Sequence, residues 1–231
     1  MKYFRIFIAL AIINLVQAQN KLHVGAKFSP SIAWNRVEPE KFTDASNVDY
    51  TFKPNLASIR WGVGMYADYM FADNFGISFG LNYITNSTGF VLKRTPGTEE
   101  TYKISTSYLQ LPVGFKVITN EIFDNGKIYF MPAITLDVLL DARINDKADF
   151  QKKPGDPVQK YTKYLNPLAS NFTFSSGVEY ELSGDLKLTG GLTYSHGLTD
   201  IDNTESGIKG STNNSFALYN HFVSLDIGLR F

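Results

Sequence analysis

The last sixteen residues, 216–231, constrain the fold more than any other stretch of the chain. From Val223 onward the sequence alternates strictly, with an apolar side chain at every second position as far as Phe231. A period of two predicts a β-strand with one apolar and one polar face. The strand reaches the last residue, which is aromatic, whereas the ends of soluble domains usually fray and are polar. This pattern favours the closing strand of a transmembrane β-barrel over the edge strand of a soluble protein.

Composition limits the other classes. The chain has 231 residues, enough for one barrel or sandwich domain, and a formal net charge of zero, which implies no nucleic-acid partner. It has no cysteine, which excludes a disulfide framework and cysteine-based metal or redox chemistry. Aromatic residues make up 14% of the chain, a richness that suits strands and membrane interfaces.

The first residues read as an export signal. Lys2 and Arg5 precede an apolar run over residues 6–16, and residues 16–18 suit a cleavage site. The run is too short for a membrane-spanning helix, which needs about twenty residues. We therefore predict a cleaved signal peptide at residues 1–18, an outer-membrane β-barrel domain at residues 19–231, and a location in the outer membrane of a Gram-negative bacterium.

The mature chain divides into eight predicted strands. They occupy residues 21–35, 58–70, 75–92, 102–119, 127–143, 169–182, 186–199 and 216–231. Polar loops are expected at residues 36–57, 144–168 and 200–215, and turns at 71–74, 93–101, 120–126 and 183–185. A ten-strand alternative stays open if residues 158–165 pair within their loop.

The loops differ in length by position. Connections after odd-numbered strands are long and those after even-numbered strands are short. Outer-membrane barrels have short periplasmic turns and longer external loops, and a single bacterial chain uses an even number of strands. We therefore predict an all-β fold, a single eight-stranded antiparallel up-and-down transmembrane β-barrel. A soluble β-sandwich, which would bury its apolar faces against each other, is the alternative.

Charged residues fix which face of each strand meets lipid. In seven of the strands they fall opposite the large apolar side chains, so a slip of one residue would expose them to lipid. The ten predicted inward charges are Lys27, Arg60, Asp68, Lys116, Asp137, Glu179, Glu181, Lys187, Asp226 and Arg230.

These ten side chains are the candidate site, an interior polar network. Five are basic and five acidic, so internal pairing can satisfy them. An eight-stranded barrel is only wide enough to be filled by side chains. We therefore expect a salt-bridged interior rather than a wide aqueous channel. A selective ion or proton path through the same residues is the alternative.

One segment resembles a known family. Residues 108–116 read YLQLPVGFK, which is similar to the Y-L-x-[IL]-P-x-x-x-K segment of the PorT-like outer-membrane β-barrel family of Bacteroidetes. Residues 131–140, the opening GAK at 25–27 and the closing GLRF at 228–231 are similar to that family as well. The resemblance implies an outer-membrane barrel of about eight strands, and a role in type IX protein secretion for some members. The terminal strand also resembles the signal read by the barrel-assembly machinery.

The residues needed for catalysis are sparse. Of the three histidines, His23 falls on the inward row, and His196 and His221 fall on outward rows at the lipid face or the rim. The sequence has no G-x-S-x-G elbow, phosphate loop or paired-histidine zinc motif. We therefore expect no enzyme activity, no cofactor and no metal.

Two further groups have a structural and a functional interpretation. Asp200, Asp202 and Glu205 lie close together in the last loop, but the spacing lacks the glycine and the distal glutamate of a calcium loop, so solvated loop acids are the better interpretation. Aromatic residues gather near the outer strand ends, where we expect a girdle at the lipid headgroups rather than a ligand platform. They are Trp34, Trp61, Tyr83, Tyr194 and Tyr219.

Together these observations predict a small, non-catalytic, monomeric, porin-like barrel of the cell envelope whose external loops bind a partner or a surface ligand. The expected partners are outer-membrane lipid and lipopolysaccharide, the barrel-assembly machinery through the C-terminal strand, and a protein at the external loops. A narrow transport pore and an accessory role in type IX secretion remain the alternatives.

Overall fold

Strands make up almost all of the secondary structure. The computed structural model describes residues 21–43, 47–55, 58–95, 97, 99–151, 155, 157–203 and 217–231, so the predicted signal peptide lies outside the described residues. Within these ranges the one helical element is a single 3₁₀ turn, η1 (Tyr161–Tyr164). A search of the same ranges finds no helix with the length and apolar character to cross a membrane.

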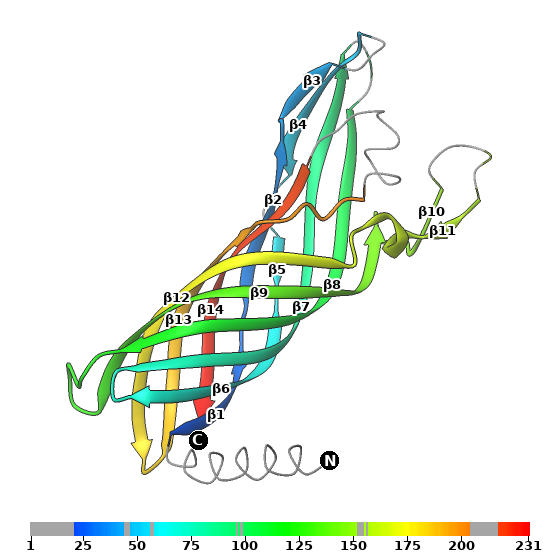
Figure 1. The fold of residues 1–231 in the computed structure, drawn as a ribbon. Helices are drawn as coiled ribbons and strands as arrows, with labels where there is room; N and C mark the ends of the chain where they lie inside the picture. The colour runs from blue at the N-terminus through cyan, green and yellow to red at the C-terminus, as the bar shows by residue number, and fades with distance from the viewer. Residues whose placement is uncertain are drawn as a thin grey trace, which may run out of the picture.

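Eight strand positions close into a ring. The order is β1-β6-β7-β8-β9-β12-β13-β14, and β14 pairs with β1, so the sheet has no end (Figure 1). Every pairing is antiparallel. The strands are β1 (Leu22–Phe28), β6 (Gly62–Ala72), β7 (Phe75–Thr95), β8 (Glu99–Ile118), β9 (Gly126–Ile144), β12 (Leu168–Ser183), β13 (Leu186–Gly197) and β14 (Ala217–Arg230). The pairing of β14 with β1 closes the sheet into a barrel, as the predicted fold requires.

Two of these eight positions consist of two strands in sequence. The first strand continues after Pro30 as β2 (Ser31–Glu38), and both parts pair with β14. Proline has no backbone N–H to donate, which explains the break there. The second position begins as β5 (Ser58–Arg60) and resumes after Trp61 as β6. The count of eight is therefore confirmed.

The ten-strand alternative is wrong. β10 (Asp149–Phe150) and β11 (Gln159–Lys160) pair only with each other, outside the ring. The residues that follow β11 turn into η1 instead of extending the ladder.

Two predicted connections prove to be strands. The predicted loop 36–57 contains β3 (Lys41–Thr43) and β4 (Asp49–Asn55), and β4 pairs with the outer part of β7. The predicted turn 93–101 narrows, because β7 runs to Thr95 and β8 begins at Glu99. In both places aromatic or aliphatic residues alternate with polar ones, as at Tyr50 and Phe52, and this alternation was present in the sequence.

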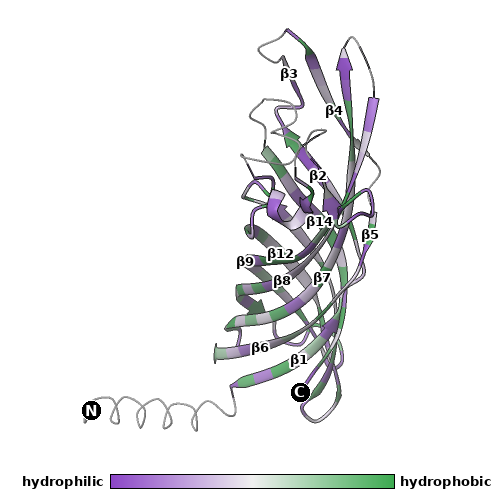
Figure 2. Ribbon diagram, turned by 90° about the vertical axis from the view of Figure 1, so that its right-hand side faces the viewer, coloured by the Kyte–Doolittle hydropathy of each residue, from purple (hydrophilic) through white to green (hydrophobic). Residues whose placement is uncertain are grey.

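The burial pattern is inverted relative to that of a soluble protein. Large apolar side chains such as Met65, Leu192 and Val113 are exposed on the outer face, 63%, 59% and 51% respectively, while polar and charged side chains are buried inside. Hydrophobic and hydrophilic residues alternate along the strands of the barrel (Figure 2). An apolar exterior around a polar interior is the arrangement of a transmembrane barrel, and it excludes the sandwich alternative.

The two ends of the barrel differ. The β6–β7, β8–β9 and β12–β13 connections are short and lie at the same end as the C-terminus, whereas β3, β4 and the outer parts of β7 and β8 project from the other end (Figure 1). We call these the short-turn end and the long-loop end. By the rule for outer-membrane barrels, the short-turn end faces the periplasm and the long-loop end faces the outside.

Candidate functional site

A buried ion cluster fills the interior near the short-turn end. The Lys116 ammonium on β8 contacts the carboxylate of Asp68 on β6 and lies 2.5 Å from Oε1 of Glu179 on β12. Nη1 of Arg230 on β14 lies 2.8 Å from the other oxygen of Glu179. All four side chains are almost fully buried, with two positive and two negative charges. The cluster is therefore neutral as a whole and joins four strands across the lumen.

Small residues make the room that this cluster needs. Tyr66 lies against Gly25, where an added Cβ would come within 2.4 Å of its ring, and Tyr129 lies against Gly191 in the same way. The two tyrosine rings flank Lys116, whose ammonium is 5.9 Å from one ring centroid and 5.1 Å from the other. Pairing small residues with large ones is how a narrow barrel fills its interior, and it surrounds the lysine with aromatic rings.

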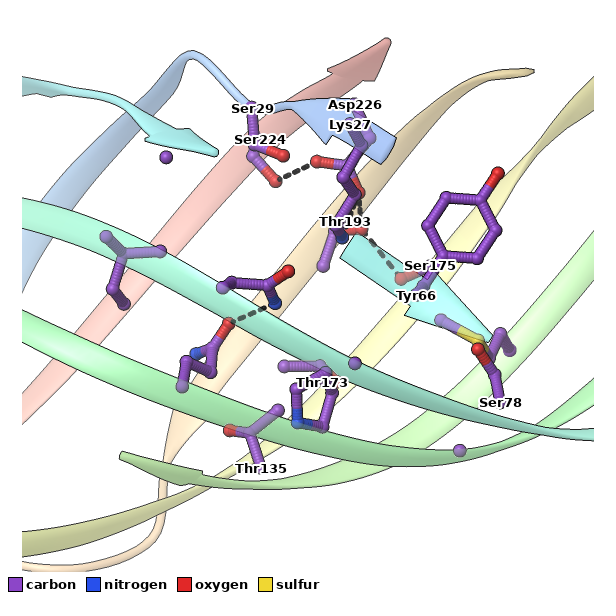
Figure 3. Close-up of a pocket in the computed structure, with 18 of the residues that line it drawn as sticks. Lys27, Ser29, Tyr66, Ser78, Thr135, Thr173, Ser175, Thr193, Ser224 and Asp226 are labelled. Carbon is purple, nitrogen blue, oxygen red and sulfur yellow. Dashed lines mark hydrogen bonds and ion pairs between the residues drawn. The ribbon is translucent and has the colours of Figure 1, made fainter. Parts of the chain in front are cut away.

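A second group of polar residues centres on Asp226 of β14. Its carboxylate lies 3.3 Å from the Lys27 ammonium and accepts hydrogen bonds from the hydroxyls of Thr193 (2.7 Å) and Ser224 (3.1 Å) (Figure 3). The Thr193 hydroxyl also lies 2.7 Å from the hydroxyl of Ser175. The group thus spans β1, β12, β13 and β14 and satisfies a carboxylate that is only 8% exposed.

Arg60 and Asp137 lie inside without an ion pair to any described residue. The Arg60 guanidinium lies 3.9 Å from the ring centroid of Phe222, a cation–π contact. Asp137 accepts a hydrogen bond of 2.9 Å from Asn171. These two charges are held by aromatic and amide partners, which the sequence alone did not indicate.

The last two candidate residues lie at the rim of the barrel. Glu181 and Lys187 face each other across the β12–β13 pair, with 3.8 Å between their charged atoms, and both are partly exposed. The structure therefore places eight of the ten candidate charges in the interior and two at the short-turn opening.

The space left inside is small. The interior cavity has a volume of about 80 Å³ and is lined by residues of both polar groups, including Lys116 and Asp226. Lys27, Tyr66 and Asp226 are labelled in Figure 3. This volume is well below the roughly 300 Å³ at which ligand pockets begin. Side chains, not solvent, fill the lumen.

An apolar cluster lies above the polar interior, towards the long-loop end. Tyr161 and Tyr164 of η1, followed by Leu165, fold inward and pack with residues of the projecting strands β4, β7 and β8, and each of the three is at most 6% exposed. Ile201 joins them from the loop after β13. We call this cluster the external core: Val37, Tyr50, Phe52, Phe90, Leu92, Ile104, Ala142, Ile144, Tyr161, Tyr164, Leu165, Ala169, Ile201 and Leu218. The predicted loop 144–168 is thus partly a plug rather than a free binding loop.

The external core makes a testable prediction. Leu165→Ala should cost about 2–5 kcal/mol of local stability, because it leaves a cavity where the plug meets the strands. The expected result is faster cleavage within residues 144–168 by an externally added protease, with the heat-dependent gel shift of the barrel unchanged. Val158→Ala is the matched control, since Val158 is 62% exposed and should leave the cleavage rate unaltered. Equal cleavage rates in both variants would show that the plug does not depend on this contact.

The histidines and loop acids take structural positions. His196 and His221 are partners across the β13–β14 pair with ring centroids 4.6 Å apart. Both belong to outward rows as predicted, yet His221 is only 3% exposed, because Trp34 stacks on its ring and the tilted His196 ring lies against it. Oδ1 of Asp200 accepts hydrogen bonds from the backbone N–H groups of Asp202 and Leu218, so this acid organises the loop. Glu205 lies outside the described residues.

Two of three comparisons with known proteins find similar ones. A family model described as outer membrane protein beta-barrel domain matches residues 2–203. A comparison with curated proteins gives no match.

Solved structures with similar folds include three membrane barrels. Neisserial surface protein A is 12% identical, with 91% of this chain and 96% of that chain covered and a TM-score of 0.49. OprG of Pseudomonas aeruginosa is 10% identical, with the same coverage and TM-score. Ail, the attachment invasion locus protein of Yersinia pestis, is 8% identical, with 91% and 99% covered and a TM-score of 0.43.

Proposed function

The chain belongs to the outer membrane protein β-barrel domain family, and on that premise we propose that it is a monomeric, non-catalytic binding protein of the cell surface. It is a small outer-membrane β-barrel of the Gram-negative type. The projecting strands at its long-loop end bind a protein partner outside the cell, and the barrel itself serves as their anchor.

One observation supports this proposal most strongly: the lumen is closed at two levels, while the β-strands continue beyond the barrel. The ion cluster and the Asp226 group fill the interior, and the external core covers it from above. A pore would need the lumen, and here the lumen is filled. The part of the chain left for an interaction is the part that projects.

That part is a small four-stranded sheet. β3 pairs with β4, β4 with the outer part of β7, and β7 with β8, and we call this unit the external sheet. One face contributes Tyr50, Phe52 and Phe90 to the external core. The opposite face carries exposed charges such as Lys53 and Lys93. β8 pairs with β9 only from Ile104, so in the described ranges the backbone of residues 99–102 forms an edge, and such edges accept an added strand from a partner.

A crosslinking experiment in intact cells tests the proposal. A photoreactive amino acid replaces Lys53 or Lys93 on the external sheet, Leu192 on the lipid face, or Asp185 in a short turn. We expect a discrete protein adduct, the same one from both external positions, and no protein adduct from Leu192. Adducts formed only from Asp185 would contradict the proposal and would place the partner in the periplasm.

The experiment also separates the alternatives within the family. Residues 108–116, which carry the similarity to PorT-like barrels, lie on β8, the strand that continues into the external sheet. Membership of that subgroup and an accessory role in type IX secretion form the second version of the proposal. It requires the adduct to contain a component of that secretion machinery. The barrel-assembly machinery should be captured through β14 only during folding, before β14 pairs with β1.

A further inference from the structure

The wall of the barrel is interrupted at the long-loop end. β2 pairs with β5 only as far as Ala33, and in the described part of the chain residues 34–38 pair on one side only, with β14. β4 turns away to pair with β7. A pocket of about 260 Å³ lies at this interruption and is lined by residues of β2, β4, β7, β13 and β14. It is separate from the interior cavity and from the charged face of the external sheet.

Polar groups line the pocket without partners of their own. Among the described residues, neither ring nitrogen of His221 and neither amide atom of Asn35 has a hydrogen-bond partner, although these side chains are only 3% and 5% exposed. Nε of Arg36 is also buried and unpartnered. A buried polar group without a partner costs about 1–3 kcal/mol, so a cluster of them around one cavity indicates that something else fills the cavity and bonds to them.

The unpartnered atoms include both hydrogen-bond donors and hydrogen-bond acceptors. The Asn35 amide offers two donor hydrogens and one acceptor oxygen, a neutral imidazole offers one donor and one acceptor, and Nε of Arg36 offers a donor. An anion only accepts hydrogen bonds and a metal ion needs only acceptors, so neither satisfies this set. Hydroxyl groups donate and accept.

The charges around the pocket also disfavour an ion. Nη1 of Arg36 is paired with Glu38 at 3.1 Å, and Glu40 adds a negative charge to the lining, so the pocket has no net positive charge to attract phosphate. For a metal, the described residues contain no cluster of three histidine or acidic ligands. A neutral ligand fits this balance best.

Aromatic rings complete the pocket. Trp34 in the middle of β2 and Tyr194 near the outer end of β13 belong to its lining. The C–H face of a sugar packs against such rings, whose π faces carry negative charge. We propose that this pocket binds one sugar unit of a cell-surface glycan, with Asn35, Arg36 and His221 bonding its hydroxyls. The volume lies just below the range for drug-sized ligands, which suits a single sugar ring.

Tryptophan fluorescence provides the test, because the chain has only two tryptophans. In a Trp61→Phe background, Trp34 is the sole tryptophan reporter in the pocket. The protein in detergent is titrated with glucose, galactose and N-acetylglucosamine. In a second experiment, the emission of Trp34 is compared between nanodiscs with and without lipopolysaccharide. We expect a saturable change in Trp34 emission with at least one of these sugars or with lipopolysaccharide. A response to free sugar identifies a soluble glycan as a source, and a response only to lipopolysaccharide identifies its saccharide part.

Two variants remove the proposed hydrogen bonds while keeping the side-chain size. His221→Phe and Asn35→Leu should each weaken binding about tenfold, the order expected for one or two lost hydrogen bonds. Tyr83→Phe is the control outside the pocket, since Tyr83 is not part of the lining and its hydroxyl bonds Ser107, and it should bind normally. The heat-dependent gel shift identifies the variants that fold. If only one of the two folds, that variant alone is enough for the test.

Three results would overturn the assignment. No emission change with any sugar or with lipopolysaccharide would mean that the pocket holds only water. Displacement of the bound sugar by inorganic phosphate at comparable concentration would make it an anion site. Unaltered affinity in both pocket variants would place the binding elsewhere on the barrel. None of these outcomes depends on the charged face of the external sheet, which carries Lys53 and Lys93, so the pocket and the proposed partner surface can fail independently.

Discussion

Lys116→Met should destabilise the barrel strongly. The change keeps most of the side-chain volume but removes the positive charge that contacts both Asp68 and Glu179. Two buried carboxylates then have only the Arg230 guanidinium between them, and breaking a buried ion pair on one side costs about 3–5 kcal/mol. Equilibrium unfolding in urea, with the protein in lipid vesicles, measures the loss.

Lys187→Met is the matched control. Lys187 also pairs with a carboxylate, that of Glu181, but the distance is 3.8 Å and both side chains are partly exposed. An exposed pair contributes about 0–1 kcal/mol, so the control should change stability little.

A second substitution separates charge from packing. Adding Asp68→Asn to Lys116→Met should recover part of the lost stability, because it removes one of the orphaned charges. Equal stabilities for the Lys116 and Lys187 variants would mean that the cluster does not hold the strands together.

Leu192→Arg should have the other large effect. Leu192 lies in the middle of β13 on the outer face and is 59% exposed. An arginine at the midplane of the lipid face of a barrel costs about 2–4 kcal/mol, since its charge must leave water. The same unfolding assay in vesicles measures it.

A position closer to the membrane surface provides the control for this prediction. Leu198→Arg places the same charge just beyond the outer end of β13, where the cost falls to about 0–1 kcal/mol. A soluble protein would tolerate both substitutions equally, because both side chains would face water. Two equal and small effects would therefore contradict the membrane-facing exterior.

Much of the barrel could be predicted from the sequence because its pattern is local. The alternation around Val223 and Leu225 needs no knowledge of the rest of the chain, and the inward charges fix the register strand by strand. The eight strand positions, the closure of β14 on β1 and the inversion of polarity all follow from that period. The interior positions of Lys116 and Asp226 follow from the same alternation.

The missed features depend on contacts between distant segments. The external core forms because Tyr161 and Ile201 fold back onto β4 and β7. In the sequence both residues stand among polar neighbours without a strand or helix period, so the pattern does not indicate that they are buried. The partners of the interior charges could not be predicted either. Periodicity places Arg60 inward but does not show that its guanidinium makes a cation–π contact with Phe222. β4 lies in the predicted loop 36–57, but it could have been predicted as a strand, since Tyr50 and Phe52 alternate with polar residues.

Single-channel recording in planar bilayers tests the central claim most directly, namely that the barrel is closed and acts through its external part. The wild-type protein should insert without discrete conductance steps, because side chains fill the interior and the external core covers it. Reproducible conductance steps from the wild-type protein would contradict the account and would make the interior polar network an ion path.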